Sequence, residues 1–91
     1  LDMPLEALEY AEKVVSYQPY YSQNYVLLAR SYLEAAKHNL EMKNYDKAIE
    51  LLEKCIEIEH PANIKPHSIF YNYQEDASTI LDSIGTGERS Y

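Results

Sequence analysis

Two segments of this chain follow the same plan, and each has the length of a helix that ends near a proline. The first reads PLEALEYAEKVVSYQP over residues 4–19, and the second reads NYDKAIELLEKCIEIEHP over residues 44–61. Both carry small and apolar side chains at three- and four-residue spacing, which places these side chains on one face of an α-helix. One such helix cannot bury its apolar face alone, so the repetition favours stacked helical hairpins.

The same spacing predicts four helices along the chain, over residues 4–17, 22–43, 45–59 and 66–84. Ser22 and Asn44 are suitable N-cap residues for the second and third helices. Gly85 is suited to close the fourth helix in the left-handed conformation. No segment alternates with period two over the length of a strand, so the sequence predicts an all-α fold. We expect one domain over residues 1–84 and a flexible tail over residues 85–91.

Composition restricts the function classes. The 91 residues carry a formal net charge of −7, from 8 basic and 15 acidic side chains, and such a chain repels the phosphates of nucleic acids. No apolar run approaches the roughly 18 residues of a membrane span, and no basic-then-apolar signal segment is present. The single cysteine, Cys55, has no internal disulfide partner, which fits a reducing compartment such as the cytoplasm. Because the chain begins with Leu1, we expect an excised domain, a processed product or a fragment.

The segment YVLLARSY resembles the first-helix signature of the tetratricopeptide repeat. An aromatic residue, a leucine with a small residue after it, and a second aromatic residue follow at the spacing of that signature, at Tyr25, Leu28, Ala29 and Tyr32. The second helix of such a repeat carries a small residue, a large apolar residue and a later proline. Two segments resemble this pattern, with Ala7, Ala11 and Pro19 in the first and Ala48, Leu52 and Pro61 in the second. Ala11 is smaller than the usual residue at its position, and Pro61 lies one residue late.

The resemblance implies a short right-handed solenoid of about one and a half repeats, followed by a capping helix. It departs from the family pattern because Ala7 and Ala48 lie 41 positions apart, whereas the usual repeat has about 34 residues. The extra residues fall between Tyr32 and Ala48. Seven residues are nearly two helical turns, so the apolar stripe stays on one face. We therefore predict that the second helix continues unbroken past Tyr32 to about Lys43.

No motif in the sequence indicates catalysis, a cofactor or a metal site. Cys55 and His60 are five positions apart and face different directions on a helix, so Cys55 is interpreted as a core residue. Glu50, Glu53 and Glu57 are interpreted as a solvated helix face and not as an acid–base pair. There is no nucleophile elbow, and no glycine-rich phosphate loop precedes Gly85. We expect a protein that is not an enzyme.

The ten tyrosines are an unusual feature of the composition. Tyr10, Tyr25, Tyr32 and Tyr45 recur at helical spacing, which predicts packing roles for them. Tyr71 and Tyr73 cannot both face inward from one helix. Tyr71 is therefore a candidate partner contact, because exposed tyrosines are favoured at interfaces.

What the resemblance implies about function is a peptide or partner protein bound on a concave face that first helices line. The side chains expected to form this site are Val26, Arg30, Leu33, Lys37 and Tyr71. Two cations seven residues apart project the same way and could hold an acidic peptide or a C-terminal carboxylate. They could equally be solvated bases balanced by Glu34 and Glu41. The lysine–asparagine clamp of chaperone-binding members is not visible.

A structural role is the alternative. The chain could be a helical segment or an oligomerisation module of a larger protein, with no peptide site of its own. Helix 4–17 resembles a second helix whose own first helix is missing, so part of its apolar surface is expected to be uncovered and to support self-association. The residues concerned are Leu1, Met3, Leu5, Leu8 and Val15.

Overall fold

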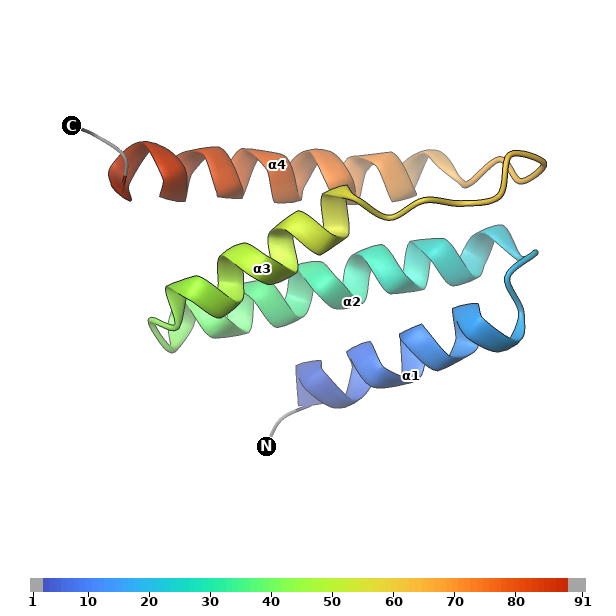
Figure 1. The fold of residues 1–91 in the computed structure, drawn as a ribbon, viewed down its shortest axis with the longest axis horizontal. Coiled ribbons are helices and arrows are strands. Elements are labelled where there is room, and N and C mark those ends of the chain that lie inside the picture. The colour runs from blue at the N-terminus through green and yellow to red at the C-terminus, as the bar shows by residue number, and fades with distance from the viewer. Residues whose placement is uncertain (1–2, 89–91) are drawn as a thin grey trace.

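The computed structural model describes residues 3–88, which form four helices and no strand. The helices are α1 (Met3–Tyr17), α2 (Ser22–Glu41), α3 (Tyr45–Ile56) and α4 (Ser68–Glu88). Successive helices run in opposite directions, so the chain forms consecutive antiparallel hairpins (Figure 1). The all-α prediction is confirmed for this part of the chain. Within the same residues, no helix has the length and apolar character needed to cross a membrane.

Helix α2 lies at the centre of the arrangement. It packs against α1, α3 and α4, and α3 also packs against α4. Helix α1 contacts α2 alone among the described helices, and it forms one edge of the molecule in Figure 1. The apolar stripe of α2 is accordingly wide, because it faces three neighbours.

The core combines fully buried alanines with a few large side chains. Alanine side chains that are 0% exposed occur on every helix and let the helix backbones approach closely. These are Ala11, Ala29, Ala35, Ala36, Ala48 and Ala77. The large side chains that fill the remaining space are Leu33, Leu51, Leu52 and Phe70. Cys55 is also 0% exposed, which confirms its interpretation as a core residue.

The turn between α2 and α3 contains a Schellman motif that the sequence pattern does not predict. Lys43 has a φ of 60°, in the left-handed region. Its N–H donates to Leu40 O at 3.0 Å, and the Asn44 N–H donates to Asn39 O at 2.8 Å, which is the Schellman pattern of a helix C-terminus. Helix α2 is unbroken past Tyr32, as predicted, but it ends at Glu41 and not at Lys43.

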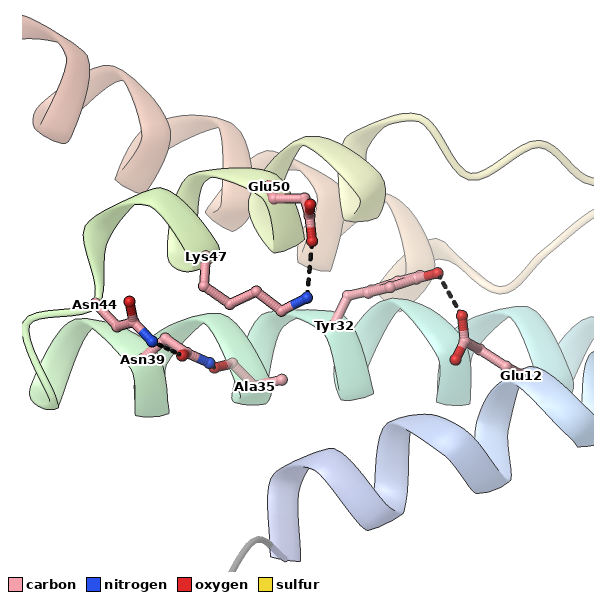
Figure 2. Close-up of polar contacts among 7 residues, drawn as sticks. All are labelled: Glu12, Tyr32, Ala35, Asn39, Asn44, Lys47 and Glu50. Carbon is pink, nitrogen blue, oxygen red and sulfur yellow. Dashed lines mark hydrogen bonds and ion pairs between the residues drawn. The ribbon is translucent and has the colours of Figure 1, made fainter.

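Asn44 precedes α3, yet its side chain makes no capping hydrogen bond. It donates instead to Asn39 Oδ1 at 3.2 Å, and Asn39 donates to Ala35 O at 2.8 Å, as Figure 2 shows. Ser22 is the first residue of α2, and the N-cap position belongs to Tyr21, also without a side-chain cap.

Helix α3 is shorter than predicted because a side chain from α4 binds its last carbonyls. Gln74 Nε2 lies 3.1 Å from Cys55 O, 3.0 Å from Ile56 O and 3.4 Å from Ile58 O. The α3 carbonyls that a further helical turn would have satisfied are thereby paired with an amide group.

Helix α4 is longer than predicted. It continues through Gly85 to Glu88, and no glycine in the described residues has a positive φ. The expectation that Gly85 closes the helix in the left-handed conformation is therefore wrong. Glycine lowers helix propensity by about 1 kcal/mol but does not by itself end a helix. Residues 85–88 of the predicted tail are helical, and residues 89–91 lie outside the described residues.

Candidate functional site

A groove of about 440 Å³ lies between α2 and α4. Four of its lining side chains come from α2, two come from α4, and one precedes α4 in the connection from α3. They are Gln23, Val26, Leu27, Arg30, His67, Ile69 and Tyr73. The groove is therefore built by two helices that are not consecutive along the chain.

Helical spacing explains why these side chains share one surface. The α2 residues lie at intervals of three and four positions, and Ile69 and Tyr73 lie four apart on α4, so each set occupies one face of its helix. Val26, Leu27 and Tyr73 are half-buried, and Ile69 is exposed. The walls of the groove are apolar and remain accessible to solvent.

Arg30 places a positive charge at this apolar surface. Its side chain is exposed and makes no ion pair with any side chain of residues 5–84. In that part of the chain Lys47 and Glu50 form the one ion pair, at 2.8 Å, drawn in Figure 2. His67 Nδ1 accepts a hydrogen bond from the Ile69 N–H at 3.2 Å, which leaves the proton of a neutral ring on Nε2. The groove thus combines an apolar wall, a guanidinium group and a potential N–H donor.

The structure brings two of the five predicted site residues together. Val26 and Arg30 line the groove. Lys37 is exposed on the same helix but does not line the groove. Tyr71 is exposed on a different side of α4, where its hydroxyl lies 3.4 Å from His60 Nε2.

Leu33 needs a correction. Its side chain is 2% exposed and belongs to the core, so a bound peptide cannot contact it without rearrangement of the helices. The sequence predicts that Leu33 lines the peptide site together with Val26 and Arg30. Helix α2 packs against α1, α3 and α4, and the buried residues of this helix include Leu33.

Sequence reasoning missed the α4 side of the groove. Ile69 and Tyr73 belong to the fourth helix, which the resemblance implies only as a capping helix, and His67 lies just before it. The signal in the sequence was the four-residue spacing of Ile69 and Tyr73, together with the positively charged face of α2. It could not be used without knowing that α4 contacts α2.

The tyrosines divide into two groups. Tyr25 and Tyr32 are 3% and 9% exposed, as their packing roles predict, whereas Tyr10 and Tyr45 are 64% and 45% exposed, so the packing roles predicted for them are wrong. The Tyr25 hydroxyl donates to Pro19 O at 2.6 Å. The Tyr32 hydroxyl donates to Glu12 Oε2 at 3.1 Å and joins α2 to α1, as Figure 2 shows. Burial, followed by this hydrogen bond, raises the pKa of Tyr32 to about 12.

The remaining reactive side chains have structural environments. Burial, with a smaller effect of Asp76, raises the pKa of Cys55 to about 11, and the thiol lies 3.4 Å from Ala29 O. A neutral, buried thiol is a poor nucleophile. Glu50, Glu53 and Glu57 are exposed. Among the described residues, no group of three or more histidine, cysteine, aspartate or glutamate side chains could hold a metal ion.

The apolar surface of α1 is only partly uncovered. Leu8 is 7% exposed, while Leu5 and Val15 are half-buried. Leu1 and the side chain of Met3, which were also expected to be uncovered, lie outside the described residues.

Comparisons with models of protein families, with curated proteins and with solved structures find no match to this chain.

Proposed function

We propose that this chain is a non-catalytic interaction module that binds a peptide or a partner protein in the groove between α2 and α4. The observation behind this proposal is the groove itself. Its apolar walls are open to solvent beside the guanidinium of Arg30, which forms no ion pair with the side chains that the structure describes. Binding sites of this kind combine apolar contact area with a small number of polar groups that fix orientation.

The arrangement of helices supports a tetratricopeptide-like interpretation. In such an array the first helices of successive repeats line one face. Helix α2 carries the first-helix signature, and α4 is the next helix in the equivalent position. The contact between α2 and α4, with α3 packed against both, agrees with this order. The same contact creates the groove.

The charge of the groove favours a ligand with a carboxylate beside an apolar side chain. The guanidinium of Arg30 can bind a carboxylate through two parallel N–H donors. Val26, Leu27 and Ile69 offer apolar area next to it. We therefore propose an acidic peptide or a peptide C-terminus as the ligand of this groove.

The test begins with a random peptide library displayed with free C-termini and selected against the protein. A labelled peptide from this selection is then titrated by fluorescence anisotropy. The double substitution Arg30→Glu, Lys37→Glu should weaken binding by at least about tenfold, since tenfold corresponds to about 1.4 kcal/mol. Arg30→Glu alone should produce most of this effect, because Lys37 does not line the groove.

The matched control is the double substitution Lys13→Glu, Lys43→Glu. It changes the net charge by the same amount at two exposed side chains that do not line the groove. Equal weakening by both double variants would show that only net charge matters. Unchanged affinity in the Arg30→Glu, Lys37→Glu variant would contradict the proposed site.

A structural or self-associating module is the second candidate. It is favoured by the position of α1, which contacts α2 alone among the described helices and leaves Leu5 and Val15 half-buried. Light scattering at rising protein concentration tests this candidate. A mass that doubles with concentration and returns to the monomer value in Leu5→Lys would support self-association through α1.

A further inference from the structure

A second cavity, which we call the notch, lies on another side of α2. Its volume is about 340 Å³, and it is bounded by the end of α1, the first half of α2 and the end of α3 with the residues after it. The lining side chains are Val15, Tyr25, Leu28, Tyr32, Lys54, Glu57, Ile58 and Glu59. None of these residues lines the groove between α2 and α4.

The inner surface of the notch is apolar and aromatic. Leu28, Tyr25 and Tyr32 are almost fully buried, while Val15 and Ile58 are half-buried. Such a surface leaves room for one or two apolar side chains of a ligand, because the volume is at the lower end of known ligand sites.

The mouth of the notch carries a negative charge. Glu57, Glu59 and Lys54 line the cavity and are all exposed. Two carboxylates and one ammonium group therefore give this part of the surface a net negative charge. Lys54 also lies near a further carboxylate, since it contributes to the lowered pKa of Glu50. The C-terminus of α3, which ends at Ile56, adds the negative end of a helix dipole.

The notch is held open by contacts between separate helices. Glu12 of α1 accepts the hydrogen bond from Tyr32 on the α1 side, and it adds a third carboxylate near the cavity. On the opposite side, Gln74 Nε2 binds Ile56 O and Ile58 O and fixes the segment that carries Ile58 and Glu59. Both walls are thus positioned without a ligand.

We propose that the notch is a second interaction site and that it binds a basic segment of a partner protein. One apolar side chain of that segment enters the notch beside Leu28 and Ile58. A neighbouring lysine or arginine lies at the mouth between Glu57 and Glu59. The charge preference is opposite to that of the groove, so one module binds two segments of different chemistry at the same time.

The test uses an amidated, fluorescein-labelled peptide of sequence GKLRKLG and a matched neutral peptide of sequence GQLQQLG, because an acidic peptide is the proposed ligand of the groove. The basic peptide should bind the protein at least about tenfold more tightly at low salt, and the binding should weaken as salt screens the charges. The double substitution Glu57→Lys, Glu59→Lys should weaken binding of the basic peptide by at least about tenfold. Ile58→Asn, which places an amide in the apolar surface, should also weaken it.

Two controls separate the notch from general charge effects. Glu41→Lys, Glu75→Lys changes the net charge equally at exposed positions outside the notch and should leave most of the affinity intact. Arg30→Glu should not weaken the basic peptide, because Arg30 lines the groove. Circular dichroism of each variant confirms that its helices are retained.

Three results would overturn the proposal. The first is the absence of any preference for the basic peptide over the neutral one. The second is equal weakening by the two double glutamate variants. The third is concentration-dependent self-association that Glu57→Lys, Glu59→Lys abolishes, because the occupant of the notch would then be a second copy of this chain.

Discussion

The two cavities share one helix but differ in how they obtain their charge. The groove takes its apolar walls and its cation from the faces of two long helices, α2 and α4. The notch takes its apolar surface from α1 and α2 and its carboxylates from residues at and after the end of α3. A helix face is fixed by its own backbone hydrogen bonds, whereas the end of α3 depends on a side chain from another helix.

This difference predicts which substitutions should alter the shape of each cavity. The groove should survive any change that leaves α2 and α4 packed together. The notch should be sensitive to the contacts that attach α1 and the end of α3 to the rest of the molecule. Those contacts are the Tyr32–Glu12 hydrogen bond and the Gln74 amide, and each can be removed by one substitution.

The largest expected effect comes from raising the pH. The folded protein holds the Tyr32 proton more tightly than the unfolded chain, because its pKa rises from the ordinary 10.0 to about 12. The free energy of unfolding should therefore be unaffected by Tyr32 below about pH 10 and should fall between about pH 10 and pH 12. The shift corresponds to a loss of at most about 2–3 kcal/mol, which solvent screening at this part-buried hydroxyl reduces.

Tyr32→Phe is the matched variant. It removes the Tyr32–Glu12 bond and should cost about 1 kcal/mol at neutral pH, but its urea-unfolding free energy should decline less between pH 10 and pH 12. The other tyrosines and the lysines titrate in both proteins. Parallel pH profiles for the two proteins would show that Tyr32 is not the group responsible.

A smaller effect is expected from Gln74→Ala. The substitution removes the donor that pairs with Cys55 O, Ile56 O and Ile58 O and should lower the free energy of unfolding by about 1–2 kcal/mol. If the two cavities differ as described, binding of the basic peptide to the notch should weaken more than binding of the acidic peptide to the groove. Asn72→Ala, at an exposed amide on the same helix, is the control and should change neither.

The sequence predicted the helices well because their signal is local. Each helix has its own apolar stripe, so the existence of all four and most of their starting points could be read from spacing alone. The unbroken length of α2 past Tyr32 followed in the same way, since no glycine or proline interrupts that segment. The helix ends were harder, because α3 ends where Gln74, 18 residues beyond Ile56, binds its carbonyls.

The cavities could be predicted only in part, because each joins elements that are distant in the sequence. Val26 and Arg30 were identified from one face of α2. Their partners Ile69 and Tyr73 could not be identified without knowing that α2 contacts α4. The burial of Leu33 likewise belongs to a helix that packs against three neighbours. Charge counting indicated an acidic chain, but it could not show that Glu57 and Glu59 gather at an apolar surface while Glu41 and Glu75 do not.

The smallest expected effect tests whether stability and binding can be separated. Lys43 has a φ of 60°, and its backbone lies between α2 and α3 at the end of the molecule opposite the two other connections (Figure 1). A residue with a β-carbon is strained in this conformation by about 1–2 kcal/mol, whereas glycine is not. Part of that gain is offset because glycine loses more chain entropy on folding.

Lys43→Gly should therefore raise the free energy of unfolding by about 0.5–1 kcal/mol. Lys43→Ala is the matched control, because it removes the same charge and keeps the β-carbon, so it should give little or no gain. Both variants preserve the Schellman hydrogen bonds of Lys43 and Asn44, which involve backbone atoms. Neither should change the affinity for the acidic or the basic peptide, since both cavities lie toward the other end of α2. A change in either affinity would show that the α2–α3 turn is coupled to the cavities and that stability alone does not set their geometry.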